Sequence, residues 1–215
     1  MNKRMLSIFI GNNSKGLLGC ENDASMFYNL FETYKFSSIY KNKNKFLLIG
    51  KEATLYNLQK IFKNNKSINT LVIYFSGHGY YGGGLEFHEK IINPLEIYES
   101  INNTFINTLN IYFILDCCYS GSFPLVKKFQ NINNVYILAS CKENQTSSES
   151  FVSVTSEVFN KIVFNKNKYN KIIVLGTFTF NLIKLIKKNN INNIITLFNL
   201  ENDNICDIFE INIIK

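Results

Sequence analysis

Short runs of consecutive apolar residues set the fold of this chain. A strand whose successive side chains are all apolar is buried on both faces, which is typical of a parallel sheet covered by helices. Stretches with helical spacing separate the runs, as at Met26, Phe27 and Leu30. The sequence therefore predicts an α/β three-layer sandwich with a mostly parallel central sheet flanked by helices. The predicted strands are Leu6–Ile10, Phe46–Ile49, Leu71–Phe75, Ile111–Leu115 and Val135–Ala139.

Apolar stripes and capping residues predict the helices. Asn22 and Asp23 are candidate N-caps of the first helix. Pro94 suits the first turn of a later helix. The other predicted elements are a helix opened by Thr54, an end of the Pro94 helix near Phe105, a helix over Thr177–Lys188, a long loop or insertion over residues 142–175, and closing strands at Ile194–Phe198 and Ile208–Ile214.

The positive charge of the chain suits a nucleic-acid-binding protein, but the scarcity of arginine argues against that function. Lys and Arg number 23 against 16 Asp and Glu, which gives a formal net charge of +7. Base and phosphate recognition depends strongly on the bidentate guanidinium group, yet the only Arg is Arg4. The Lys residues are scattered singly among Asn. We therefore expect a solvated basic surface and no nucleic-acid partner.

The cysteines and the hydropathy pattern indicate the compartment. An odd number of cysteines, without a CxxC motif and with two of them adjacent, does not suit a disulfide framework. No stretch reaches the 18 or so apolar residues of a membrane span, and the amino terminus lacks the apolar run of a signal peptide. We expect a soluble cytoplasmic protein without a membrane partner. The cysteines are Cys20, Cys117, Cys118, Cys141 and Cys206.

Two predicted strands end in reactive residues. His78 follows Phe75 by three positions, and Cys118 follows Leu115 by three. Open α/β sheets bind ligands beyond the carboxyl ends of their strands, and neighbouring strands lie about 5 Å apart. If these strands are neighbours, the thiol and the imidazole form a Cys/His dyad in which His takes the thiol proton and later protonates the leaving amine. The backbone N–H groups of Gly79 and Cys118 would then face a developing oxyanion.

Either residue alone is more often structural than catalytic, because a Cys after a buried strand usually acts as a small hydrophobe. The prediction therefore depends on the joint pattern. The segments IYFSGHG and FILDCCYSG resemble the catalytic His and Cys segments of the caspase-like cysteine peptidases, and D-x-C-x-S-G is most similar to the metacaspase branch. Three further segments resemble metacaspase elements in the same order: Ile10–Ala24, Cys141–Ser150 and Gly176–Ile186.

The resemblance implies a type I metacaspase-like core. It implies one domain over residues 1–215, with a large-subunit-like part at about 1–130 that contains His78 and Cys118. A small-subunit-like part follows at about 131–215 and includes the long loop at about 142–175. By register within the motif, Cys118 is the nucleophile and Cys117 occupies the variable position. The metacaspase branch also suggests a monomer.

The resemblance further implies an acidic specificity pocket and cleavage of protein or peptide substrates after Lys or Arg. Substrate Asp would need a guanidinium clamp, and Arg4 lies near none of the motifs. Carboxylates would instead bind a cation, although Asp23 has helix N-capping as an alternative role. The residues that map to the pocket are Cys20, Asp23, Ser76 and Asp116.

No cofactor is required by anything in the sequence. Metacaspases commonly bind calcium, but the segment after His78 has only Glu86 and Glu89 as carboxylates, and calcium needs several oxygen ligands. A zinc site of His78, Cys117 and Cys118 is a poor alternative, since adjacent Cys seldom both reach one tetrahedral metal. The competing functions are a caspase-fold scaffold that acts through protein contacts and an Asp-specific caspase.

Overall fold

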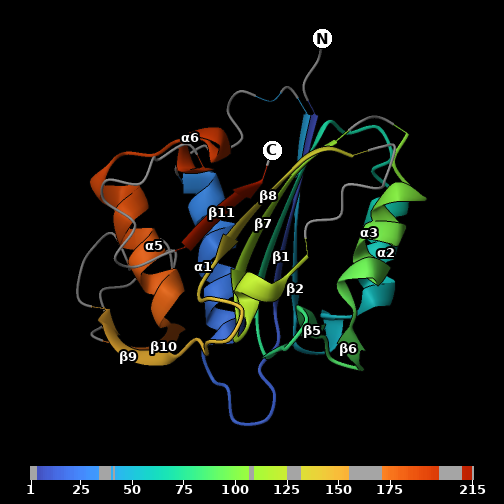
Figure 1. Ribbon diagram of the computed structural model, residues 1–215. Helices are drawn as coiled ribbons and strands as arrows, with labels where there is room; N and C mark the ends of the chain where they lie inside the picture. Colours follow the sequence, from blue (N-terminus) through green and yellow to red (C-terminus); the bar gives the residue numbers. More distant parts are fainter. Residues whose placement is uncertain are drawn as a thin grey trace.

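The computed structural model describes residues 4–33, 40, 42–106, 109–124, 132–154, 171–198 and 210–214. A six-stranded sheet forms its centre, in the order β11-β8-β7-β3-β1-β2 (Figure 1). Five neighbouring strands run parallel, and β11 pairs antiparallel at one edge. The strands are β1 (Arg4–Gly11), β2 (Asn42–Ile49), β3 (Thr70–Ser76), β7 (Leu109–Asp116), β8 (Ile132–Ala139) and β11 (Glu210–Ile214).

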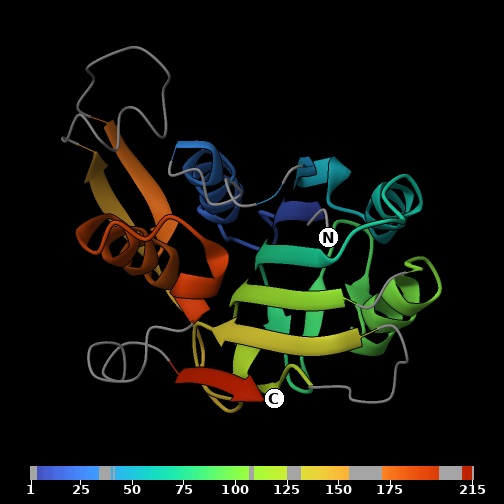
Figure 2. The ribbon, with the colours of Figure 1, turned by 90° about the horizontal axis from the view of Figure 1, so that it is seen from above.

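Helices cover both faces of this sheet, as Figures 1 and 2 show. The predicted α/β sandwich is thereby confirmed. One face carries α1 (Cys20–Thr33), α5 (Thr177–Lys188) and α6 (Ile194–Phe198), and the other carries α2 (Leu55–Lys63) and α3 (Pro94–Asn102). The remaining elements are the short helices η1 (Gly50–Glu52) and η2 (Ser120–Ser122), the small sheet of β4 (Gly79–Tyr80), β5 (Gly84–Glu86) and β6 (Ile91–Ile92), and the pair β9 (Glu149–Val154) and β10 (Lys171–Gly176).

Burial on both faces explains the apolar runs. Every residue of β3 is buried, and its side chains alternate between two hydrophobic clusters. Val72 and Tyr74 pack in the cluster under α1 and α5, whereas Ile73 and Phe75 pack in the cluster under α2 and α3. Its interior, Leu71–Phe75, is therefore apolar at each position, because both faces of the strand are removed from water.

Local capping fixes two of the helices as predicted. The Thr54 hydroxyl accepts the backbone N–H of Asn57 at 3.1 Å and begins α2. Pro94 occupies the first turn of α3, where Asn93 and Glu96 form a capping box. Both arrangements satisfy backbone donors that the first turn of a helix leaves free. Helix α3 ends at Asn102, three residues before the predicted end.

Two predictions about the carboxyl-terminal part were wrong. Ile194–Phe198 is a short helix and not a strand, because Ile194, Leu197 and Phe198 share helical spacing and bury one face in the core. Residues 142–175 are not one long loop. Strand β9 and most of β10 lie in this range and pair antiparallel, and their Val152 and Ile173 are buried.

The predicted boundary between the large-subunit-like and small-subunit-like parts, near residue 130, lies outside the described residues. Residues 125–131 and 155–170 lie outside the described residues, and so do Cys206 and most of the carboxyl terminus. Within the described segments, no helix combines the length and the apolar character needed to cross a bilayer.

The core position Phe113 offers a direct test of this packing. Its side chain is fully buried in β7 and packs against Phe123 at a ring-centroid distance of 4.8 Å. Truncation leaves a cavity, so Phe113→Ala is expected to lower the free energy of unfolding by roughly 3–5 kcal/mol in urea denaturation. The matched variant Phe151→Ala, at a position 81% exposed, should change it by less than about 0.5 kcal/mol. Equal losses in the two variants would contradict the fold.

Candidate active site

The pairing of β3 with β7 brings the two motif segments together. These strands are parallel neighbours, and their last residues, Ser76 and Asp116, lie opposite each other. The Gly77 N–H donates to the Asp116 carbonyl at 3.3 Å just beyond the strand ends. His78 and Cys118, which follow the two strands, line one pocket. The prediction that these strands are neighbours is confirmed.

Cys117 and Cys118 have opposite environments. Cys117 is only 2% exposed, and burial raises the pKa of its thiol. Cys118 is half-buried, and its Sγ lies 3.8 Å from the carbonyl oxygen of Ser147 at the pocket wall. The chain then turns through Tyr119, which has a left-handed φ of 55°. Of the two adjacent thiols, the one assigned by the motif register is therefore the accessible one.

The rest of the motif holds this turn in place. The buried Ser120 hydroxyl accepts the Cys141 N–H at 3.1 Å, which ties the turn to the segment after β8. A side chain at Gly121 would place its Cβ 2.7 Å from the Glu143 nitrogen. Ser120 and Gly121 are thus positions where packing selects a small residue, while Cys118 faces the pocket.

A backbone carbonyl fixes the state of the His78 ring. The Nε2 atom of His78 lies 3.0 Å from the carbonyl oxygen of Ser14. A carbonyl can only accept, so Nε2 is the donor in this contact, and in the neutral imidazole the free electron pair lies on Nδ1. Orientation of one ring nitrogen by a hydrogen bond at the other is how proteins fix a histidine base. Sequence reasoning missed Ser14, because it lies 64 residues from His78 in a polar loop.

Gly79 lies directly against the Cys118 segment. It pairs with Leu85 of β5, and the hydrogen bond beside this pair runs from the Glu86 N–H to the His78 carbonyl. Gly79 therefore occupies a non-hydrogen-bonded position, where its own N–H points away from β5. An added Cβ would lie 2.0 Å from the Cys118 carbonyl oxygen, so only glycine allows this approach.

Asp23 is a buried residue of the pocket and not a helix N-cap. Helix α1 begins at Cys20, which places Asp23 inside its first turn. Its carboxylate accepts the Gly176 N–H at 3.0 Å and the Ser76 hydroxyl at 2.8 Å. These donors come from distant parts of the chain, so tertiary contacts and not local capping determine its role.

Asp116 is the second buried carboxylate. Its Oδ2 accepts the backbone N–H and the hydroxyl of Thr179, and its Oδ1 accepts the hydroxyl of Ser147 at 2.9 Å. An added Cβ on Gly176 would lie 2.0 Å from Asp116 Oδ2 and 3.0 Å from Asp23 Oδ2, so both carboxylates converge on this glycine. Burial raises the pKa of both groups, and the negative charge of Asp116 raises that of Asp23 further.

Glu149 is a third carboxylate in the pocket wall that sequence reasoning missed. It accepts the backbone N–H of Gly19 at 2.6 Å and that of Leu18 at 3.1 Å, just before α1. Glu149 lies in Cys141–Ser150, a segment that resembles a metacaspase element, and this position could have indicated a role. The same segment also contains the exposed Glu143, so the sequence alone does not show which Glu reaches the pocket. Cys20 also lines the pocket, and burial raises the pKa of its thiol. The predicted pocket residues Cys20, Asp23, Ser76 and Asp116 thus lie together.

The carboxylates near His78 do not fit a calcium site. Glu86 accepts hydrogen bonds from Ser14, Lys15 and Tyr80, which occupy both of its oxygens. Glu89 is exposed. Among the residues that the structure describes, no three His, Cys, Asp or Glu side chains are grouped to hold a metal ion.

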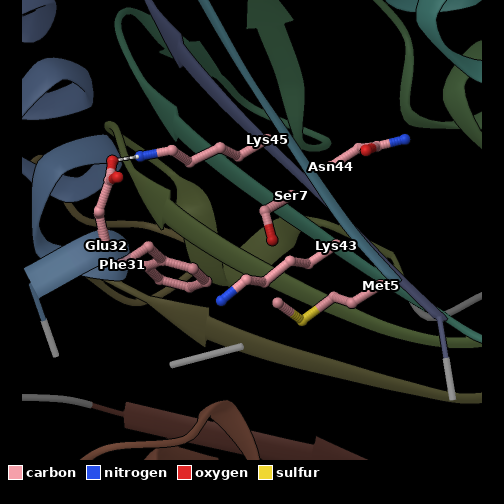
Figure 3. A pocket seen from close by; sticks show the side chains of 7 residues that line it. All are labelled: Met5, Ser7, Phe31, Glu32, Lys43, Asn44 and Lys45. Carbon is pink, nitrogen blue, oxygen red and sulfur yellow. Dashed lines mark hydrogen bonds and ion pairs between the residues drawn. The ribbon is translucent and has the colours of Figure 1, made fainter. Parts of the chain in front are cut away.

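A larger cavity, of about 130 Å³, lies elsewhere (Figure 3). Its lining includes Met5 and Ser7 from the first half of β1, whereas the active-site residues follow the carboxyl ends of parallel strands. The pocket beside Cys118 is smaller, about 80 Å³, but only it joins a thiol, an imidazole and carboxylates. Arg4 begins β1, at the end of the sheet away from this pocket.

Comparison with known proteins agrees with this geometry. The family model described as the caspase domain matches residues 4–203. The chain belongs to the caspase domain family. A paracaspase from Dictyostelium discoideum is 27% identical over an alignment of 209 residues, and the match covers 86% of this chain and 50% of that protein. The chain thus spans about half the length of this curated relative.

The fold itself has a solved counterpart. A protein from Geobacter sulfurreducens of known crystal structure superimposes with a TM-score of 0.57 at 13% sequence identity. The match covers 86% of this chain and 83% of that one. At this identity the likeness concerns the fold alone, and it agrees with the parallel five-stranded core and its flanking helices.

The exposure of the cysteines predicts their order of alkylation. Brief treatment of the folded protein with iodoacetamide should label Cys118 at least about tenfold faster than Cys117, because only the accessible thiol meets the reagent. Peptide mass mapping measures both sites, and protein unfolded in urea serves as the control in which the two rates converge. Equal labelling of both residues in the folded state would show that the arrangement is wrong.

Proposed function

We propose that this chain is a cysteine endopeptidase that cleaves peptide bonds after Lys or Arg. One observation carries the proposal: a single pocket is lined by Cys118, His78 and three carboxylates. Membership of the caspase domain family supports peptide-bond chemistry, and family substrates are proteins. The pocket lining supports the proposed preference for a cation, since it contains carboxylates and none of its residues is Lys or Arg.

The proposed reaction begins with proton transfer from the Cys118 thiol to Nδ1 of His78. The sulfur attacks the substrate carbonyl carbon, and the oxyanion accepts hydrogen bonds from the Gly79 and Cys118 N–H groups. The intermediate collapses as the imidazolium protonates the leaving amine, which leaves a thioester on Cys118. Water then attacks the thioester and gives a proton to His78. Release of the carboxylic acid restores the thiol.

The substrate side chain before the scissile bond is proposed to occupy the acidic pocket. Asp23 and Asp116 converge on Gly176, and Glu149 lies on the wall formed by β9. Burial of two neighbouring carboxylates costs free energy that a bound cation offsets, because opposite charge favours their ionised form. A carboxylate side chain would add a further negative charge to this pocket. The arrangement therefore favours Lys and Arg over Asp.

Peptide hydrolysis tests this proposal. Fluorogenic peptides that end in Arg or Lys should be cleaved, and the matched Asp peptide should be cleaved at least about a hundredfold more slowly. Cys118→Ala should reduce kcat by at least about a thousandfold without loss of folding, because it removes the nucleophile. Addition of Ca²⁺ should leave the rates unchanged.

The alternatives predict different results. Cleavage after Asp alone would overturn the specificity and favour an Asp-specific caspase. Absence of cleavage of all three peptides by folded protein would favour a scaffold that acts through protein contacts. Activation by Ca²⁺ would overturn the expectation that cleavage needs no calcium.

Glu149 provides a separate test of specificity. Glu149→Gln keeps an oxygen that can accept the Gly19 N–H but removes the charge beside the pocket. We expect kcat/KM for the Arg peptide to fall about tenfold, which corresponds to loss of one charge interaction of about 1.4 kcal/mol. The control Glu143→Gln, at an exposed position of the same segment, should leave kcat/KM unchanged. Equal effects of the two variants would exclude a direct role for Glu149.

A further inference from the structure

A buried carboxylate outside the pocket is tied to the predicted base. Glu86, in β5, is only 8% exposed. Its side chain accepts three hydrogen bonds, one each from Ser14, Lys15 and Tyr80. Neither the reaction sequence nor the specificity pocket uses it. Burial of a carboxylate costs free energy unless hydrogen bonds compensate it. The position of Glu86 therefore needs an explanation.

Glu86 reaches His78 from two sides. Its backbone N–H donates to the His78 carbonyl at 2.9 Å, which fixes the main chain of the histidine. Its Oε1 accepts the Ser14 hydroxyl at 3.0 Å, and the Ser14 carbonyl is the group that faces His78 Nε2 at 3.0 Å. The hydrogen bonds thus form a closed circuit in which Glu86, Ser14 and His78 each bond to the other two.

The Ser14 carbonyl sits in a turn that needs outside support. The Leu17 N–H donates to this carbonyl at 3.0 Å, and the two residues between them have positive φ values, 46° for Lys15 and 93° for Gly16. A left-handed backbone is unfavourable for lysine and persists where surrounding contacts hold it. Here Glu86 supplies those contacts, through the Ser14 hydroxyl and a 2.9 Å ion pair with Lys15.

The Glu86 carboxylate is held in its charged form. Burial opposes ionisation, but hydrogen bonds from Tyr80, Lys15 and Ser14 outweigh it and keep the pKa of Glu86 below its usual range. The Asn12 side chain, itself buried, adds a hydrogen bond to the Glu86 carbonyl. The loop that follows β1 is therefore anchored to β5 at its start and in its middle.

We propose that Glu86 is a positioning residue that acts through Ser14 to orient the imidazole of His78. It holds the Ser14 carbonyl against Nε2, so that Nδ1 remains the nitrogen that takes the thiol proton. The role in turnover rests on the proposed peptidase function, whereas the effect on the His78 ring and on Cys118 does not.

The most direct test removes the hydrogen bond between Ser14 and Glu86 without creating a cavity in the core. Ser14→Ala removes the hydroxyl but keeps the backbone carbonyl, and Ser14 is only half-buried. We expect kcat for the Arg peptide to fall about ten- to a hundredfold with KM within about twofold, because a misplaced base affects proton transfer more than binding. Ser14→Thr, which restores a hydroxyl, should recover most of the rate. Glu86→Ala, which removes the acceptor of the Ser14 hydroxyl, should lower kcat as Ser14→Ala does.

A second readout does not require peptidase activity. Alkylation of Cys118 by iodoacetamide at pH 7 should slow about tenfold in Ser14→Ala, because an imidazole that is free to turn takes the thiol proton less often. Two controls match the changes: Ser25→Ala removes a hydroxyl bonded to the Glu21 carbonyl in α1, and Glu32→Ala removes the partner of Lys45 at the surface. Both should leave alkylation and kcat unchanged.

The outcomes separate the two proposals. Slower alkylation in Ser14→Ala, in a chain that cleaves no peptide, would support the positioning role and overturn the peptidase function. Peptide cleavage by the wild type with unchanged kcat and alkylation in Ser14→Ala would overturn the positioning role alone. A KM increase at constant kcat would also overturn it, since that result would place Ser14 in substrate binding.

Discussion

The register between β3 and β7 is the constraint on which the rest of the site depends. Ser76 lies opposite Asp116, and from that pair onward the two chains leave the sheet at the same edge. A shift of one residue would reverse which face each side chain occupies, and it would break both hydrophobic clusters at once. The packing of two cores therefore fixes the relative position of His78 and Cys118. The arrangement of the thiol and the imidazole thus depends on apolar contacts that lie outside the pocket.

The sequence could predict what local patterns encode. Continuous apolar runs identified the buried strands, and the segments around His78 and Cys118 identified the edge of the sheet where a site should form. Thr54 and Pro94 marked their helices because capping is a local interaction. The short helix at Ile194–Phe198 was misassigned because a five-residue run with four apolar side chains fits either period until its packing partners are known.

What the sequence could not predict depends on contacts between distant segments. The roles of Ser14 and Glu149 come from hydrogen bonds that span 64 and 130 residues. For Asp23, the local sequence suggests a role that tertiary contacts replace. Its position near a helix start favours a cap, but its carboxylate instead accepts the Gly176 N–H, 153 residues away. Polar side chains bond to whatever donors folding brings near, so residue type alone does not assign them.

The carboxylates of Asp116 and Asp23 approach Gly176 closely, so the acidic pocket depends on side-chain volume as well as on charge. Both buried carboxylates reach this residue because it has no side chain, and a single methyl group would lie 2.0 Å from Asp116 Oδ2. Its backbone N–H also donates to Asp23, so the same residue leaves room between the acids and neutralises part of their charge. The proposed selectivity for a cation therefore depends also on a residue that carries no charge. The pocket can hold two buried acids side by side because one backbone position between them has no side chain.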